Sequence, residues 1–141
     1  MNIRFFILVI TTSLLASTAF ADGHRVPSPA GAKVYFIAPT NGSIVSSPVT
    51  VKFGLVGMGV APAGTEKKKT GHHHLLIDTK LKSYDESVPA DAENMHYGGG
   101  QTEAVIKLAP GTHTLQLVLG DHNHIPHMPP VQTEVITIKV Q

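Results

Sequence analysis

The chain has 141 residues, enough for one domain with a single hydrophobic core, and it contains nine histidines but no cysteine or tryptophan. Its 11 Lys and Arg residues nearly balance its 10 Asp and Glu residues, so the charge favours neither a nucleic acid nor an anionic membrane as partner. Without cysteine the chain has no disulfide and no thiol nucleophile.

Residues 1–21 have the pattern of a secretory signal peptide. Arg4 supplies a positive charge, residues 5–16 form an apolar run, and Ala19-Phe20-Ala21 matches an A-x-A cleavage site. The apolar run is too short to span a membrane, which needs about 20 residues. We therefore expect export to the periplasm, cleavage before Asp22 and no membrane span in the mature chain.

The rest of the sequence predicts an all-β fold, because its apolar residues alternate with a period of two and no amphipathic helix is evident. A polar stretch at residues 80–100, with Pro89 and a run of glycines, is expected to form a long irregular excursion outside the core. Short strands separated by turn signals favour an immunoglobulin-like antiparallel β-sandwich of about seven strands, with a closed barrel as the alternative. We place this domain at residues 33–141, after a flexible segment at residues 22–32. Strands are expected at residues 33–38, 49–55, 72–78, 102–108, 113–119 and 131–140.

Residues 71–78 read GHHHLLID and form the most unusual of these strands. Side chains alternate along a strand, so His73 shares the core face with Leu75, whereas His72 and His74 face the other way. This H-x-H pair places two imidazoles about 7 Å apart at Cα on one face, which allows both to bind one metal ion. The same spacing also arises by chance in a histidine-rich strand.

A second histidine cluster lies in residues 120–130, GDHNHIPHMPP, where His122, His124 and His127 belong to a loop stiffened by prolines. Stiffness favours metal binding because the ligands need not be ordered when the ion binds. In an immunoglobulin-like order this loop lies at the same end of the sandwich as the start of the histidine strand. We therefore expect the two clusters to be neighbours.

His96 is a further candidate ligand, and it follows Met95 directly. Met58 and Met128 also lie in loops near the predicted histidine clusters. Thioether beside imidazole favours copper, particularly Cu(I), whereas imidazole alone suits zinc, copper or nickel. The alternative is that these methionines only fill gaps in loops.

Two other histidines have separate interpretations. His113 leads from a Pro-Gly-Thr turn into an apolar alternation, so we expect it at a corner of the sandwich, hydrogen-bonded to the backbone. Cleavage after Ala21 would make His24 the third residue, where a free amine, two amides and the imidazole bind Cu(II) or Ni(II) in a square plane. A histidine at the third position is also often accidental.

The sequence offers little for catalysis. No G-x-S-x-G elbow surrounds Ser43, Ser46 or Ser47, no H-E-x-x-H motif is present, and the carboxylates are scattered. Copper-zinc superoxide dismutases share an immunoglobulin-like sandwich and an H-x-H strand, but this chain lacks their cysteine pair and their glycine-histidine pattern. We therefore expect a binding protein and not an enzyme.

Long ordered motifs, including TGHHHLLIDT, LAPGTHTLQLVLGD and HIPHMPPV, resemble a bacterial family of small exported domains of unknown function over residues 31–140. Some members carry a rod shape-determining label, but nothing here resembles a multi-spanning cell-shape protein. The resemblance implies that His124 and His127 matter more than His122. More weakly, PTNGSIVSSPVTVKF resembles the opening of periplasmic copper-resistance carriers, whose mature chains usually begin with His where this one would begin with Asp22.

Two functions remain open from the sequence. The first is a periplasmic metal-binding protein, for copper ahead of zinc, that buffers or delivers the ion. Neutral imidazole ligands would release the metal as the pH falls below about 6. The second is a metal-free adhesion or interaction module of the cell envelope, with a glycan, a peptide or another envelope protein as partner. The predicted metal ligands are His72, His74, His96, His124 and His127.

Overall fold

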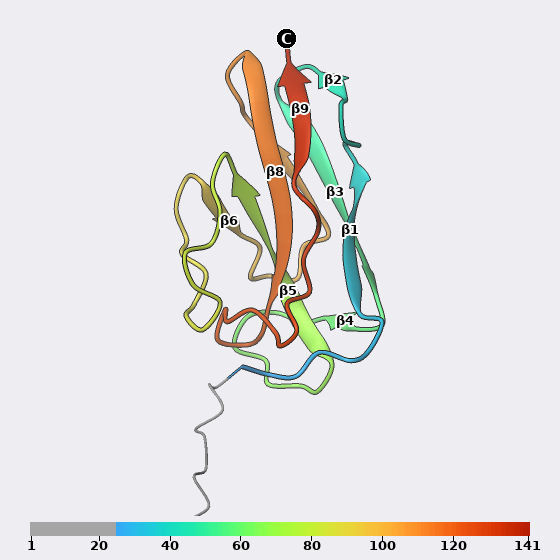
Figure 1. The fold of residues 1–141 in the computed structure, drawn as a ribbon, viewed down its shortest axis with the longest axis vertical. Helices are drawn as coiled ribbons and strands as arrows, with labels where there is room; N and C mark the ends of the chain where they lie inside the picture. Colours follow the sequence, from blue (N-terminus) through green and yellow to red (C-terminus); the bar gives the residue numbers. More distant parts are fainter. Residues whose placement is uncertain (1–24) are drawn as a thin grey trace, which may run out of the picture.

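The computed structural model describes residues 25–141, in which nine strands and no helix are found (Figure 1). The predicted signal peptide and His24 lie outside the described residues. Within residues 25–141 no helix is long and apolar enough to cross a membrane. The strands are β1 (Lys33–Ala38), β2 (Ile44–Val45), β3 (Val49–Val56), β4 (Gly59–Val60), β5 (Thr70–Ile77), β6 (Asn94–His96), β7 (Glu103–Ile106), β8 (Gly111–Gly120) and β9 (Ile136–Val140).

The strands form two sheets. One has the order β1-β3-β7, and the other has the order β2-β9-β8-β5-β4, with β6 also paired to β5. The pairs β1-β3-β7 and β9-β8-β5 are antiparallel and follow the neighbour order of the two immunoglobulin sheets, whereas β2 runs parallel to β9. The predicted β-sandwich is therefore confirmed, and the short strands β2, β4 and β6 are added to the six predicted ones.

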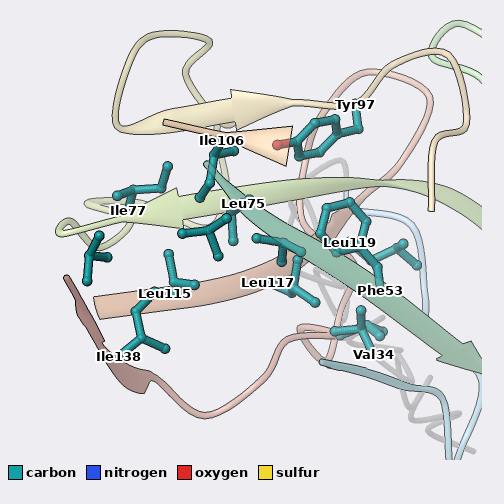
Figure 2. Close-up of a cluster of buried hydrophobic side chains, with 14 residues drawn as sticks. Val34, Phe53, Leu75, Ile77, Tyr97, Ile106, Leu115, Leu117, Leu119 and Ile138 are labelled. Carbon is teal, nitrogen blue, oxygen red and sulfur yellow. The ribbon is translucent and has the colours of Figure 1, made fainter. Parts of the chain in front are cut away.

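The hydrophobic core lies between the two sheets, as the alternating apolar residues predict. Figure 2 shows Val34 and Phe53 of the three-stranded sheet facing leucines of β5 and β8. Leu75, Leu117 and Leu119 are completely buried. Because burial of each leucine contributes about 1.5–3 kcal/mol, this layer fixes which face of β5 points inward.

The C-terminal strand is shorter than predicted. Residues 131–135 do not belong to β9, although Val131 is buried and its carbonyl accepts a hydrogen bond from the N–H of Leu119. The reason is local: the hydroxyl of Thr133 accepts the N–H of Leu117 at 3.0 Å and interrupts the regular ladder. The register of β9 with β8 resumes at Ile136.

Residues 80–100 are not entirely outside the core, which corrects the sequence prediction. β6 pairs with β5, and Tyr97 belongs to the core, with its ring 5.1 Å from that of Phe53. Val88 is also buried. The physical reason is that β6 extends the sheet beside β5, and the residue after it, Tyr97, packs against Phe53 on the core side. Leu76, His72 and His74 lie on the other face of β5 and are fully buried as well.

The start of the described chain is attached to the loop after β8, within the segment predicted to be flexible. The N–H of Ser28 donates to the carbonyl of Met128 at 2.9 Å, and the N–H of Met128 donates to the carbonyl of Val26 at 3.0 Å. The guanidinium of Arg25 donates to the carbonyl of Pro126 at 2.9 Å. These contacts brace the loop that carries the second histidine cluster.

Candidate metal centre

Four histidines from three separate parts of the chain converge at one end of the sandwich. His72 and His74 come from β5, His96 ends β6, and His124 lies in the loop after β8. One ring nitrogen from each lies within 4.8 Å of the other three. Figure 1 shows that the loop after β8 lies at the end of the sandwich where β5 begins, as the sequence predicted.

The ring nitrogens are already close to the spacing of ligands on one ion. Nε2 of His72 lies 3.0 Å from Nε2 of His74 and 3.0 Å from Nδ1 of His124. Two nitrogens bound tetrahedrally at the usual 2.0–2.1 Å lie about 3.3 Å apart. Across the four rings, the centroids of every pair are separated by between 4.6 Å and 5.9 Å. We refer to these four residues as the histidine cluster.

Strand pairing and two glycines create the space for this cluster. His74 lies directly opposite His96 in the register of β5 and β6, and their rings stack at 5.1 Å. A Cβ atom at Gly120 would lie 2.8 Å from Nε2 of His74, which is closer than real contacts allow. A Cβ atom at Gly98 would overlap the ring of His96. Glycine at both positions therefore leaves room for imidazole rings.

His124 is held in place by its loop. Its backbone is in the left-handed region, with φ at +67°, and its N–H donates to the carbonyl of Asp121 at 3.0 Å. Oδ1 of Asp121 accepts the N–H groups of Asn123 and Ile125 at 2.8 Å and 3.0 Å. The carbonyl of His124 accepts the N–H of Val88. The loop is therefore ordered by its own hydrogen bonds and by the excursion.

Burial keeps the inner histidines neutral. His72 and His74 are fully buried. Desolvation, together with the nearby histidine charges, lowers the pKa of His72 to about 4 and that of His74 to about 2. Desolvation and then His124 also lower the pKa of His96. Since metals bind the neutral imidazole, these rings are ready to coordinate at neutral pH. For these three rings, protons therefore compete with the metal only at a lower pH than the value of about 6 expected from ordinary pKa values.

The hydrogen bonding of the cluster is incomplete without a cation. Nε2 of His72 faces two other ring nitrogens at 3.0 Å, but it carries either one proton or one lone pair. Nδ1 of His72 and Nδ1 of His74 are buried and have no hydrogen-bond partner. Converging lone pairs on neutral rings suit a transition-metal ion, which accepts several nitrogens at once. The four residues therefore fit a metal ion.

Two other histidines of the loop lie outside the cluster. His127, a predicted ligand, is fully buried, and its Nδ1 lies 3.3 Å from the carbonyl of Leu119. Its ring packs beside Gly71, where a Cβ atom would lie 3.0 Å from its Cε1. His122 is partly exposed, and its Nε2 lies 2.9 Å from Nδ2 of Asn123. The structure thus brings together four of the five predicted ligands.

His73, Met58 and Met95 lie on the core side, whereas Met128 does not. The ring of His73 packs 5.1 Å from that of Phe53, which confirms its predicted inward direction. Met58 and Met95 pack against the hydrophobic core, and Met128 is half exposed. These positions agree with gap filling, so the thioether argument for Cu(I) loses its support. The donors that the structure groups together are imidazoles.

His113 lies at the other end of β5 from the cluster and has the predicted corner role. Its Nε2 lies 2.9 Å from the carbonyl of Ala109, and its Nδ1 lies 2.6 Å from Oδ2 of Asp78. Sequence reasoning missed Asp78. The available signal was its place at the end of β5, since the pairing of Ile77 with Leu115 brings it beside Thr114.

Comparison with known proteins gives one match. The model of a family described as "Domain of unknown function (DUF4399)" matches residues 51–141, which is more than half of the chain and contains every histidine of the cluster. No curated protein and no solved structure matches the chain.

Proposed function

We propose that this chain, which belongs to the DUF4399 family of domains of unknown function, binds one transition-metal ion through the histidine cluster. The observation that carries the proposal is the convergence of four imidazole nitrogens within 4.8 Å at one end of the sandwich. Strand pairing, glycine spaces and a hydrogen-bonded loop hold the four rings before any ion arrives, and such preorganisation favours affinity.

Copper is our first choice of ion, with zinc as the competitor. For a given set of nitrogen donors, divalent copper binds more tightly than zinc and the lighter first-row ions. This argument replaces the one from methionine sulfur and favours Cu(II). Zinc remains the competitor because four nitrogens in a closed shell also suit its tetrahedral preference.

The role we propose is buffering or delivery of the ion and not catalysis. Catalytic zinc sites usually have three protein ligands and keep a fourth position for water or substrate, whereas this cluster offers four ligands. Exposure of His96 at the surface gives a route for transfer to another molecule. The signal-peptide pattern of residues 1–21 supports a periplasmic location as part of the same proposal.

Metal analysis of the mature protein tests this function. Tag-free protein from periplasm is analysed for bound elements, stripped with a chelator, and titrated with copper and with zinc. We expect one ion per chain in wild type and none in the double variant His72→Ala/His74→Ala. His122→Ala is the matched control. It removes a histidine that lies outside the cluster, in the loop that carries His124, and the variant should bind metal as wild type does.

A wild-type protein that retains no metal and shows no saturable binding in either titration would contradict the proposal. The metal-free envelope module would then be the better hypothesis. A pull-down that captures the same envelope partner with chelator and with added metal would support that alternative.

A further inference from the structure

We propose that Asp121 is a positioning residue of the metal site, whose Oδ2 accepts a hydrogen bond from Nδ1 of His72 when Nε2 of His72 binds the ion. The inference rests on the proposed function, and it assigns a role to a buried carboxylate that the histidine cluster does not include. Its consequence is that the site is built for a cation with a fixed negative charge beside it.

The first observation concerns Asp121 itself. Its side chain is only 2% exposed, so burial removes its carboxylate from water. Oδ1 accepts two backbone N–H groups of the loop, but Oδ2 is buried and has no hydrogen-bond partner. Within residues 25–141, no Lys, Arg or His forms an ion pair with Asp121. A buried charge without a partner is unfavourable and calls for a donor or a cation.

The second observation concerns His72. Its Nε2 faces the other imidazoles of the cluster, so this nitrogen is the one placed to bind an ion. Its Nδ1 points elsewhere, is buried and has no partner. When Nε2 binds a metal, the ring proton resides on Nδ1, which becomes a donor in need of an acceptor. Metal-binding histidines commonly give this proton to a carboxylate.

The third observation brings the two groups together. His72 pairs with Gly120 in the register of β5 and β8, and Asp121 is the next residue. His74 pairs with Val118, two residues further from Asp121 along β8. The register therefore places Asp121 nearer to His72 than to His74. The unpartnered Oδ2 of Asp121, at the start of the loop after β8, and the unpartnered Nδ1 of His72, on the paired strand β5, thus belong to neighbouring parts of the chain.

An ion in the cluster would satisfy both groups. It fixes the proton of His72 on Nδ1, which can then donate to Oδ2 of Asp121. It also places positive charge near a carboxylate that otherwise has none. Neutral imidazoles alone leave that negative charge uncompensated, so Asp121 favours cation binding by charge as well as by orientation.

The test uses zinc, which is diamagnetic and permits NMR of the loaded protein. In ¹⁵N-labelled wild type with zinc, we expect Nδ1 of His72 to be protonated and its proton to exchange slowly with water. Asp121→Asn keeps an Oδ1 acceptor for the loop but removes the charge. We expect this variant to bind zinc about 10–100-fold more weakly in competition with a chelator, with a faster-exchanging Nδ1 proton.

Asp91→Asn is the matched control, because Oδ1 of Asp91 likewise accepts backbone N–H groups, those of Glu93 and Asn94, but at an exposed turn. It should bind zinc as wild type does. Equal zinc affinity of wild type and Asp121→Asn, or a rapidly exchanging Nδ1 proton of His72 in loaded wild type, would overturn this inference alone. A wild type that binds no zinc and no copper would overturn the proposed function as well.

Discussion

The Nε2 atoms of His72 and His74 lie 3.0 Å apart within the buried part of the histidine cluster. At that distance, protonation of both rings to imidazolium would place two like charges in contact, away from water. The pair therefore tolerates a metal ion between its rings far better than it tolerates two protons. This relationship determines how the metal-free protein should respond to acid.

We predict that the metal-free protein loses stability as the pH falls from about 6.5 towards 4. In the folded state the pKa is about 4 for His72 and about 2 for His74, whereas an unfolded histidine titrates near 6.5. The unfolded chain therefore binds more protons in this range, so the free energy of unfolding decreases as the pH falls. Urea unfolding of stripped protein at pH 7.5, 5.5 and 4.5 measures the effect.

The variant His74→Leu is the control for this pH dependence, because it removes one titrating ring and keeps an apolar side chain of similar size. Between pH 7.5 and 4.5 the free energy of unfolding should fall less for His74→Leu than for wild type. The variant should therefore gain stability relative to wild type as the pH falls. A difference that stays constant between pH 7.5 and 4.5 would show that His74 is not held neutral.

A second prediction concerns the space beside His74. Gly120→Ala places a Cβ atom 2.8 Å from Nε2 of His74, so the ring must move away from the other nitrogens. Overpacking of this kind costs about 1–3 kcal/mol, which corresponds to roughly 5- to 150-fold weaker metal binding if the cost falls on the position of the ring. Competition with a chelator measures the affinity. Gly59→Ala is the control, since its Cβ atom meets only Thr70 at an ordinary 3.5 Å and should leave binding unchanged.

The strand part of the site was predictable because strand periodicity is local. Alternation along residues 72–78 places His73 inward and His72 with His74 outward, and the ring contacts of His73 with Phe53 and of His72 with His74 agree. The sandwich order also predicts that the loop after β8 lies beside the start of β5. Both inferences depend only on the period of two and on the order of the strands.

The remaining parts depend on contacts that a local pattern does not contain. Residues 94–96 have no strand periodicity, so the pairing that sets His96 opposite His74 was not predicted. The choice of His124 over His127 follows from the left-handed backbone of His124 and the loop hydrogen bonds of Asp121. An aspartate whose side chain can accept the N–H two residues later is typical of a loop turn, and the stretch Asp121-His122-Asn123 could have identified Asp121 in this way.

A third prediction concerns the pair of Asp78 and His113. Burial raises the pKa of Asp78, but hydrogen bonds from His113 and Thr114 outweigh it and lower the pKa overall. The hydrogen bonds of His113 to Asp78 and to the Ala109 carbonyl raise the pKa of His113. The stabilisation that protonated His113 contributes is fully present below pH 6.5, and it is lost as the pH rises through the raised pKa of His113. Stability from Asp78 is present above pH 3.8 and is lost as the pH falls through its lowered pKa.

Asp78→Asn should therefore destabilise the protein most between about pH 4 and 6.5. We expect a loss of about 1–2 kcal/mol at pH 5.5, the lower part of the range for a charged hydrogen bond because Asp78 is partly exposed. The loss should become smaller at pH 9, and urea unfolding at both values measures it. Metal affinity should not change, because the pair lies at the other end of β5. A larger loss at pH 9 than at pH 5.5 would contradict the assignment.

A fourth prediction concerns the direction in which the ion leaves. His72 and His74 are fully buried and His124 is partly buried, so His96 is the exposed member of the cluster. An incoming ligand can therefore replace His96 first and take the ion from that side. In His96→Ala, water occupies this position from the start, and an attacking ligand meets less competition. Because affinity changes act mainly through dissociation, we expect zinc to leave about tenfold faster or more while one ion per chain is still bound.

Stopped-flow transfer of zinc from loaded protein to a coloured chelator measures this rate. His122→Ala, which removes a histidine just outside the cluster, should release zinc as wild type does. The rate should also rise with chelator concentration, because direct attack on the bound ion depends on the attacking ligand whereas prior dissociation does not. Release that is independent of chelator concentration and unchanged in His96→Ala would show that the ion leaves by opening of the loop around His124, and delivery through His96 would then be wrong.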